Sequence, residues 1–133
     1  MKYFKKNKLN KISFDSGDLT FLESNKNIPF EIKRIFYMYN LKYELSRGAH
    51  AHKMLHQFIV PISGNFYVSL NDGIHKKEEF FLSKPNEGLY IPPMTWTDLY
   101  KFSIDAIVLV LASDFFFEDD YIRNFDSFLE MVE

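Results

Sequence analysis

Short extended segments separated by turn residues fill the middle of this chain, and this pattern limits its fold more than any other feature. Residues 65–70 alternate so that Phe66, Val68 and Leu70 share one face, and Asn71-Asp72-Gly73 follows as a hairpin turn. Similar patterns predict further strands over residues 31–39, 58–62, 79–82, 88–91 and 106–112. The last of these is apolar on both faces, as expected for a strand in the middle of a sandwich. Because no helical pattern separates the segments, the sequence predicts an all-β fold, an antiparallel sandwich or barrel.

Only the C-terminus has helical periodicity. Apolar side chains recur at helical spacing there: Tyr121, Ile122, Phe125, Leu129 and Val132. Asp119 or Asp120 is available as the N-cap of this short α-helix. At 133 residues we expect a single domain, residues 1–133, with the helix packed against the barrel or a neighbouring subunit.

Composition excludes several classes of function. The chain has no cysteine, so it has no disulfide, no thiolate metal site and no cysteine nucleophile. Its net charge of −2 argues against a general attraction to nucleic acid, and we interpret the lysines near the start as a solvated N-terminus. This basic start lacks the apolar region of a signal peptide, and no apolar run approaches the about 20 residues of a membrane span. We expect a soluble, cytoplasmic protein that binds neither nucleic acid nor membranes.

Two histidines one residue apart are the main candidates for chemistry. They lie in Arg47-Gly48-Ala49-His50-Ala51-His52, and on a strand His50 and His52 point to the same face. Such a pair titrates near neutral pH and suits proton transfer or metal binding. The alternative is structural, with both rings satisfying buried hydrogen bonds.

The surrounding spacing resembles the first motif of the cupin family. His50-x-His52 is followed after four residues by Gln57 and after six more by Gly64, but cupins carry an acidic ligand at the position of Gln57. The region that resembles the second cupin motif, residues 88–98, has Trp96, Thr97 and Asp98 where the third metal-binding histidine would fall. Two imidazoles are too few for a firm transition-metal site. We therefore expect no metal and no other cofactor, and we assign the pair to acid-base chemistry. Removal of a proton next to a carbonyl would produce an enediolate, whose charge needs a donor or a cation nearby.

Five segments give a narrower resemblance. They are Arg34-Ile-Phe-Tyr-Met-Tyr39, Arg47-Gly-Ala-His-Ala-His-Lys53, Gly88-Leu-Tyr-Ile-Pro-Pro-Met-Thr-Trp96, Leu109-Val-Leu-Ala-Ser-Asp114 and Asp120-Tyr-Ile-Arg-Asn-Phe-Asp126. Together they resemble the dTDP-sugar 3,4-ketoisomerases, also described as WxcM-like proteins, from about residue 30 to the C-terminus. The resemblance implies a cupin-type jelly roll of the RmlC-like kind with a short C-terminal helix. It also implies dTDP-4-dehydro-6-deoxy-glucose as substrate, a product with the ketone at C3, and a place in the biosynthesis of 3-amino-3,6-dideoxy sugars for surface glycans such as O-antigens.

The resemblance also implies roles for individual residues. The base would be His50 or His52, which the sequence does not rank, and Tyr37 would move a proton between the C3 and C4 oxygens unless it packs on the sheet. Other candidates for binding the substrate are Arg34, Arg47, Gln57, Tyr39, Tyr90, Trp96 and Thr97. Gln57 is expected on the face of the histidines, Thr97 is a candidate for setting the C4 configuration, and the alternatives are a surface ion pair for Arg34 and core packing for Tyr90 and Trp96.

The family is dimeric, with strands exchanged between subunits. The extended, apolar N-terminal third, which includes Ile12, Phe14, Leu19, Phe21 and Leu22, agrees with such an exchange, so we expect a homodimer. The competing functions are a dTDP-sugar 3,5-epimerase, a non-catalytic cupin that binds a sugar nucleotide, and a metal-dependent dioxygenase.

Overall fold

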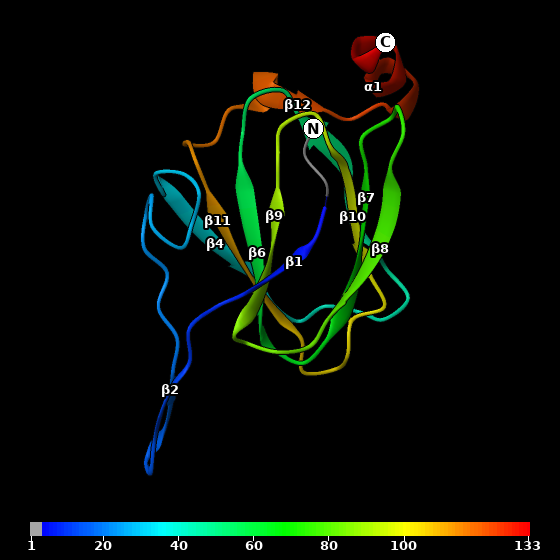
Figure 1. Cartoon of the computed structure of the whole chain (residues 1–133). Coiled ribbons are helices and arrows are strands. Elements are labelled where there is room, and N and C mark those ends of the chain that lie inside the picture. The colour runs from blue at the N-terminus through cyan, green and yellow to red at the C-terminus, as the bar shows by residue number, and fades with distance from the viewer. Residues whose placement is uncertain (1–3) are drawn as a thin grey trace.

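The computed structural model describes residues 4–133 and forms two five-stranded antiparallel sheets packed face to face (Figure 1). The first, called here the β6 sheet, has the order β1 (Lys6–Lys8), β9 (Glu87–Ile91), β6 (Gln57–Ser63), β11 (Ile107–Ala112) and β4 (Arg34–Met38). The second, the β10 sheet, has the order β12 (Tyr121–Ile122), β5 (Arg47–His52), β10 (Trp96–Tyr100), β7 (Phe66–Asn71) and β8 (Lys77–Leu82). The predicted antiparallel sandwich is confirmed.

Alternation along the strands fills the space between the two sheets. Val108 and Val110 of β11 point inward and join the main core with Ile59 of β6 and with Leu70 and Leu99 of the facing sheet. Leu109 and Leu111 of β11 point outward and are covered by the N-terminal segment, in a cluster with Leu9, Ile28, Phe30, Phe58 and Val60. This coverage explains why the strand is apolar on both faces.

The start of the C-terminal helix differs from the prediction. The α-helix is α1 (Phe125–Val132), and its N-cap is Asn124, whose side chain accepts the backbone N–H of Ser127. The preceding residues form a 3₁₀ turn, η1 (Glu118–Asp120), and then strand β12, which pairs with the edge of β5. Tyr121 and Ile122 are β-prone and find a strand to pair with, so tertiary pairing overrides their helical spacing. The helix packs on the outer face of the β10 sheet through Phe128.

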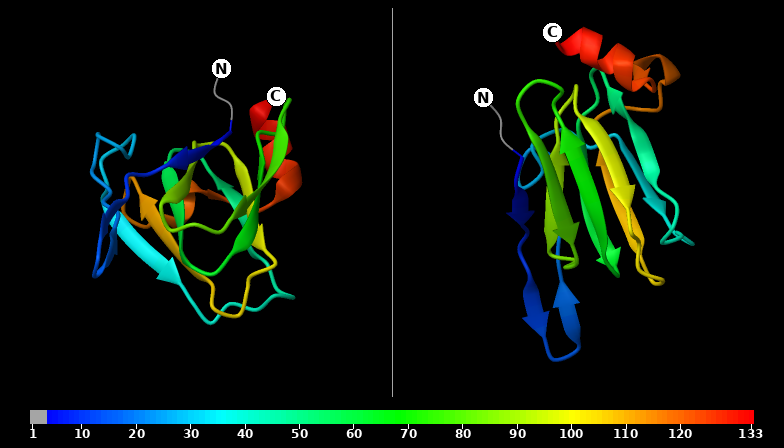
Figure 2. Two further views of the ribbon diagram at one scale, coloured as in Figure 1. Left: turned by 60° about the horizontal axis from the view of Figure 1, so that its bottom comes forward. Right: turned by 90° about the vertical axis from the view of Figure 1, so that its right-hand side faces the viewer.

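A hairpin projects from the body of the sandwich at the end opposite α1 (Figures 1 and 2). It consists of β2 (Ile12–Phe14) and β3 (Gly17–Leu19), which pair only with each other. Its apolar side chains Ile12, Phe14 and Leu19 are 44%, 58% and 48% exposed. No helix in residues 4–133 is long and apolar enough to cross a membrane.

Candidate active site

A β-bulge in β5 sets the direction of the histidine pair. Thr97 of β10 lies opposite His50, but the next residue, Asp98, lies opposite Gly48, so Ala49 is an extra residue. Ala49 has φ 58° and Gly48 has φ 105°, both in the left-handed region. Cross-strand partners lie on the same face of a sheet, so the bulge brings Arg47, opposite the core residue Leu99, to the face of His50 despite their odd spacing.

Gly48→Ala is expected to lower the free energy of unfolding by about 3 kcal/mol, because a Cβ there would lie 2.6 Å from the Thr97 carbonyl oxygen. Gly17→Ala is the matched control, since Gly17 also has a positive φ but its Cβ would meet nothing within 4 Å. We expect the control to lose about 1 kcal/mol. Urea denaturation of the two variants measures the difference, and equal losses would mean that the bulge tolerates a side chain.

His50 and His52 lie against each other at the inner face of the β10 sheet. Their ring centroids are 5.0 Å apart and their planes are nearly perpendicular. The ring of Tyr121 contacts both, with centroids 5.0 Å from His50 and 4.3 Å from His52. Tyr121 lies opposite His52 in the β12–β5 pairing, and the Arg123 guanidinium lies 4.1 Å from the Tyr121 ring while it also pairs with Glu118. The two imidazoles are therefore held at a fixed position by aromatic contact.

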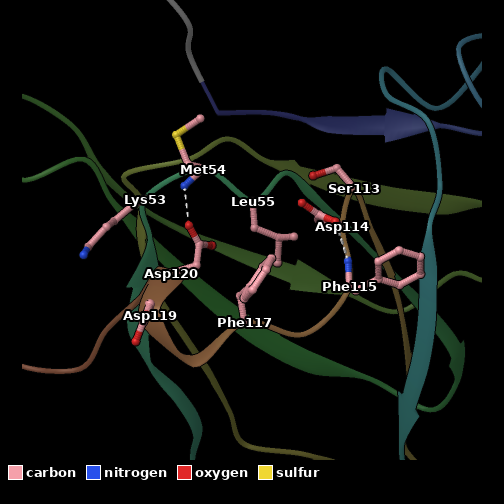
Figure 3. Close-up of a pocket in the computed structure, with 9 residues that line it drawn as sticks. All are labelled: Lys53, Met54, Leu55, Ser113, Asp114, Phe115, Phe117, Asp119 and Asp120. Atoms are coloured by element: carbon pink, nitrogen blue, oxygen red, sulfur yellow. Dashed lines mark hydrogen bonds between the residues drawn. The ribbon is translucent and has the colours of Figure 1, made fainter.

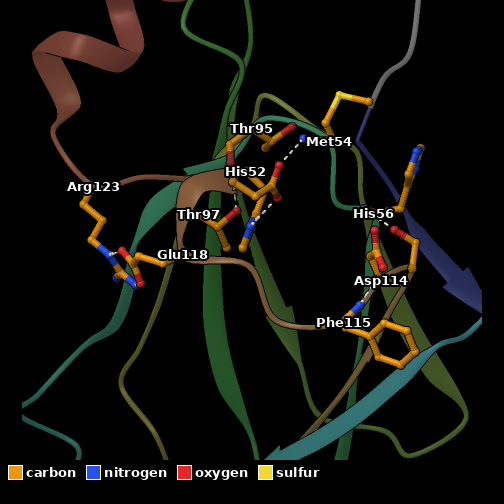
Figure 4. A network of polar contacts seen from close by, with 11 residues as sticks. His52, Met54, His56, Thr95, Thr97, Asp114, Phe115, Glu118 and Arg123 are labelled. Carbon is orange, nitrogen blue, oxygen red and sulfur yellow. Dashed lines mark hydrogen bonds and ion pairs between the residues drawn. The ribbon is translucent and has the colours of Figure 1, made fainter.

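The carboxylate of Asp120 contacts one ring nitrogen of His52. His52 is 6% exposed, and its Nδ1 lies 3.1 Å from Oδ2 of Asp120. The other oxygen of Asp120 accepts the backbone N–H of Met54 at 2.8 Å, and the network is drawn in Figure 4. The Nε2 atom of His52 is buried without a hydrogen-bond partner in residues 4–133. His52 is thus fixed at one nitrogen and unsatisfied at the other.

Burial keeps both imidazoles neutral at neutral pH. Desolvation is the main cause that lowers the pKa of His52 from 6.5 to about 4; the neighbouring His50 and Arg34 act in the same direction, and Asp120 opposes them. Desolvation also lowers the pKa of the half-buried His50, although not as far, and a backbone hydrogen bond at Gly48 acts in the opposite direction. His50 therefore remains the stronger base of the two.

The lowered pKa of His52 makes folding stability depend on pH. As pH falls from 6.5 towards 4, the unfolded chain binds a proton at His52 that the folded chain does not, so stability decreases. Between pH 7 and pH 5 we expect the free energy of unfolding of wild type to fall by about 2 kcal/mol more than that of His52→Gln. Chemical denaturation at the two pH values measures this loss. His75 is exposed, and His75→Gln provides the control: its free energy of unfolding should change with pH as that of wild type does. The same change in His52→Gln would contradict the assignment.

Arg34 supplies an interior cation next to the pair. It begins β4, points inward with Phe36 and Met38, and lies close enough to lower the pKa of His52. Its guanidinium carbon is 5.2 Å from the Phe36 ring centroid and 5.8 Å from that of Phe116. Its Nε is buried without a hydrogen-bond partner, and no carboxylate within residues 4–133 forms an ion pair with it. The alternative of a surface ion pair is therefore wrong, and the cation is available to an anion.

Three further predicted residues lie on inner faces. Thr97 is buried opposite His50, and its hydroxyl donates to the Thr95 carbonyl oxygen at 3.2 Å. Gln57 is buried at the start of β6, in the sheet that faces the histidines. The expectation that it shares a strand face with His50 and His52 is wrong, because the chain turns after His52. Arg47 is exposed at the far end of β5, five residues from His52.

Four predicted aromatic residues lie outside this interior. Tyr37 and Tyr39 are 62% and 61% exposed, because alternation in β4 turns their side chains away from Arg34 and Phe36. Tyr90 packs on the outer face of the β6 sheet, where its hydroxyl lies 2.6 Å from Nδ1 of His56. Trp96 packs under α1 against Phe125 and Phe128. None of the four meets the histidine pair within one chain.

Asp120 and Tyr121 contact the pair but are absent from the residues predicted for the site. The segment from Asp120 to Asp126 carries part of the family resemblance, but the helical spacing makes Asp120 a candidate N-cap and Tyr121 a helix residue. The signal that could have found them is the β-propensity of Tyr121-Ile122. Residues 4–133 contain no group of three His, Asp or Glu side chains placed to hold a metal ion. That the site works without a metal remains a prediction from the sequence.

A cavity of about 410 Å³ adjoins the histidine pair through Asp120 (Figure 3). Its walls come from the β5–β6 connection and from the segment after β11, and they include Met54, Leu55, Phe115 and Phe117. Asp120 thus separates the buried His52 from an open, largely apolar hollow.

Comparison with known proteins gives consistent matches over nearly the whole chain. Residues 2–133 match the sequence model of the family described as FdtA, WxcM-like, C-terminal. A TDP-4-oxo-6-deoxy-alpha-D-glucose-3,4-oxoisomerase from Aneurinibacillus thermoaerophilus is 44% identical over 122 residues, which cover 92% of this chain and 87% of that protein. A 3,4-ketoisomerase from Helicobacter canadensis has a TM-score of 0.93 at 44% identity, covering 97% of this chain and 96% of the other.

Two further solved structures bear on ligand and fold. A histidine-to-asparagine mutant of the 3,4-ketoisomerase QdtA from Thermoanaerobacterium thermosaccharolyticum, in complex with TDP-4-keto-6-deoxyglucose, has a TM-score of 0.93 at 34% identity, covering 99% of this chain and 96% of the other. The 3,5-epimerase RmlC from Legionella pneumophila shares 14% identity at a TM-score of 0.76, covering 95% of this chain and 76% of the other, and shows the fold alone. The predicted RmlC-like, cupin-type sandwich is confirmed.

Proposed function

Because this chain belongs to the FdtA family of WxcM-like proteins, we propose that it is a sugar-nucleotide 3,4-ketoisomerase acting on TDP-4-keto-6-deoxyglucose. The observation in the fold that carries the proposal is a pair of neutral imidazoles, His50 and His52, facing an interior that also holds the unpaired cation of Arg34. A base beside a cation is what proton abstraction next to a ketone requires.

His50 is the group we propose as the base that removes the C3 proton. A general base works best when its pKa lies near the working pH, which favours His50 over His52, whose pKa is about 4. His50 is also the less buried of the two, so it has more room to meet a substrate. The C3–H bond breaks, its electron pair forms the C3=C4 double bond, and the C4 oxygen becomes negatively charged. The proton on His50 exchanges with water, and His50 then delivers a proton to C4.

Arg34 is proposed to stabilise the enediolate. Its guanidinium is permanently charged and lies against Phe36 and Phe116, where the low dielectric strengthens its attraction for an anion. Arg47, exposed at the far end of the same strand as the pair, is the residue we propose for the diphosphate, and Gln57 for a sugar hydroxyl.

Incubation with TDP-4-keto-6-deoxyglucose in deuterated water tests the function. The proposal expects a 3-keto product that carries deuterium at C4. Exchange at C3 and C5 without ketone migration would instead identify a 3,5-epimerase, and no exchange with tight binding would identify a non-catalytic sugar-nucleotide protein. A metal analysis that finds stoichiometric bound iron would instead support the metal-dependent dioxygenase.

Thr97 is proposed to influence the C4 configuration of the product. It lies directly opposite His50, so its side chain borders the position from which a proton returns to C4. NMR analysis of the products of wild type and of Thr97→His tests this role. An unchanged C4 configuration would exclude it.

We also propose that the active form is a homodimer in which the β2–β3 hairpin of each subunit crosses to the other. The hairpin exposes Ile12, Phe14 and Leu19, and the edge strand β4 exposes Ile35 and Tyr37 on its outer face. Burial of both surfaces against a second copy would remove them from water. Sedimentation of wild type and of Phe14→Ser with Leu19→Ser tests the proposal, since a dimer should become a monomer, and a wild-type monomer would contradict it.

A further inference from the structure

His52 has a nitrogen that the mechanism above leaves without a role. Its Nε2 is buried and has no hydrogen-bond partner in residues 4–133, whereas its Nδ1 lies 3.1 Å from Asp120. A buried polar atom of this kind costs free energy unless a ligand satisfies it. The atom is therefore a candidate contact for the substrate.

Asp120 determines what kind of contact Nε2 can make. An ionised carboxylate only accepts hydrogen bonds, so Nδ1 of His52 carries the hydrogen and Nε2 carries the lone pair. The carboxylate cannot turn away, because its Oδ1 accepts the Met54 N–H at 2.8 Å and its backbone oxygen accepts the Lys53 N–H at 2.9 Å. His52 therefore presents a fixed hydrogen-bond acceptor to the interior.

The reaction needs such an acceptor. Moving the ketone from C4 to C3 requires two protons to move, one from C3 to C4 and one from the C3 oxygen to the C4 oxygen. His50 carries the first. Tyr37, which was predicted for the second, has its ring on the outer face of β4.

We infer that Nε2 of His52 receives the proton of the substrate's 3-hydroxyl group, and that Asp120 is the positioning residue that fixes the required tautomer. The inference rests on the proposed function. As the O3–H bond breaks, the C3=O bond forms and the C3=C4 electron pair takes the proton held by His50 at C4. The imidazolium of His52 then gives its proton to the C4 oxygen, so that no proton is gained or lost. Its pKa of about 4 favours this rapid return.

Asp120→Asn tests the inference directly. The Met54 N–H will keep the amide oxygen, so the amide NH₂ faces Nδ1 of His52 and forces the hydrogen onto Nε2. With the acceptor lost, we expect 3-keto product formation to fall about 100-fold or more. Because His50 is untouched, substrate deuterated at C3 should still lose its label in ordinary water. Asp119→Asn, at the exposed neighbouring position, is the matched control and should react like wild type.

Nitrogen-15 NMR of histidine-labelled protein gives a second readout that does not depend on turnover, and its wild-type measurement does not depend on the variant folding. Wild-type His52 should be the neutral tautomer with hydrogen on Nδ1, and Asp120→Asn should reverse it. Hydrogen on Nε2 in wild type, or equal loss of label exchange and product formation in Asp120→Asn, would overturn the inference. A wild-type protein that makes no 3-keto product at all would instead contradict the proposed function.

Discussion

Replacement of His50 by asparagine is expected to lower turnover of TDP-4-keto-6-deoxyglucose about 1000-fold, because it removes the base that takes the C3 proton. Within residues 4–133 the half-buried side chain contacts the rings of His52 and Tyr121 and no other aromatic ring, so the variant should fold and still bind the nucleotide. For wild type, kcat/KM should stay high below pH 6.5 and fall once His50 is protonated, since its pKa is lowered.

Steady-state kinetics and loss of C3 label measure the effect of His50→Asn. Both should fall together, in contrast to Asp120→Asn, which should lose product formation but keep label exchange. The exposed His75 supplies the control substitution His75→Asn, which should leave turnover unchanged. Retention of a tenth or more of wild-type turnover by His50→Asn would assign the base elsewhere.

Arg34→Met is the second change with a large expected effect. It removes the cation that stabilises the enediolate but keeps an unbranched apolar side chain between Phe36 and Phe116. We expect kcat to fall about 100-fold to 1000-fold, in the range observed when one donor to an oxyanion is removed. Because the buried Nε has no partner, the same change should raise the free energy of unfolding by about 1 kcal/mol.

This opposite response of activity and stability distinguishes a functional cation from a structural one. Kinetics and urea denaturation on the same preparation measure both. The pKa of His52 should rise in Arg34→Met, because Arg34 lowers it in wild type. Arg34→Lys keeps a positive charge and should recover part of the lost kcat. A variant that loses stability and keeps kcat would show that Arg34 serves only the fold.

The sequence predicts the sandwich because alternation and turn residues are local signals. The turn after β7 and the doubly apolar β11 are both where the sequence predicts them. The helix start is wrong because the pairing of Tyr121 with His52 depends on a strand almost 70 residues away in the chain, and helical spacing alone does not reveal it.

The site is predictable only where one strand carries it. His50 and His52 share a face by alternation, and the sequence identifies them. The sequence does not reveal that the bulge at Ala49 turns Arg47 to the face of His50. A bulge exchanges the two faces for the residues on one side of it, and it leaves no clear signal in the sequence. Tyr37 could not be assigned to a face because β4 presents bulky side chains both inward and outward. Asp120 depends on the 3₁₀ turn that brings it to His52.

The central claim is that this site acts on carbon 3 of a 4-keto sugar nucleotide and moves its ketone. TDP-4-keto-6-deoxyglucose with deuterium at both C3 and C5, incubated with wild type in ordinary water and followed by NMR, tests it most directly. We predict a 3-keto product that has lost the C3 deuterium and retained the C5 deuterium. Loss of both labels with the ketone still at C4 would contradict the account.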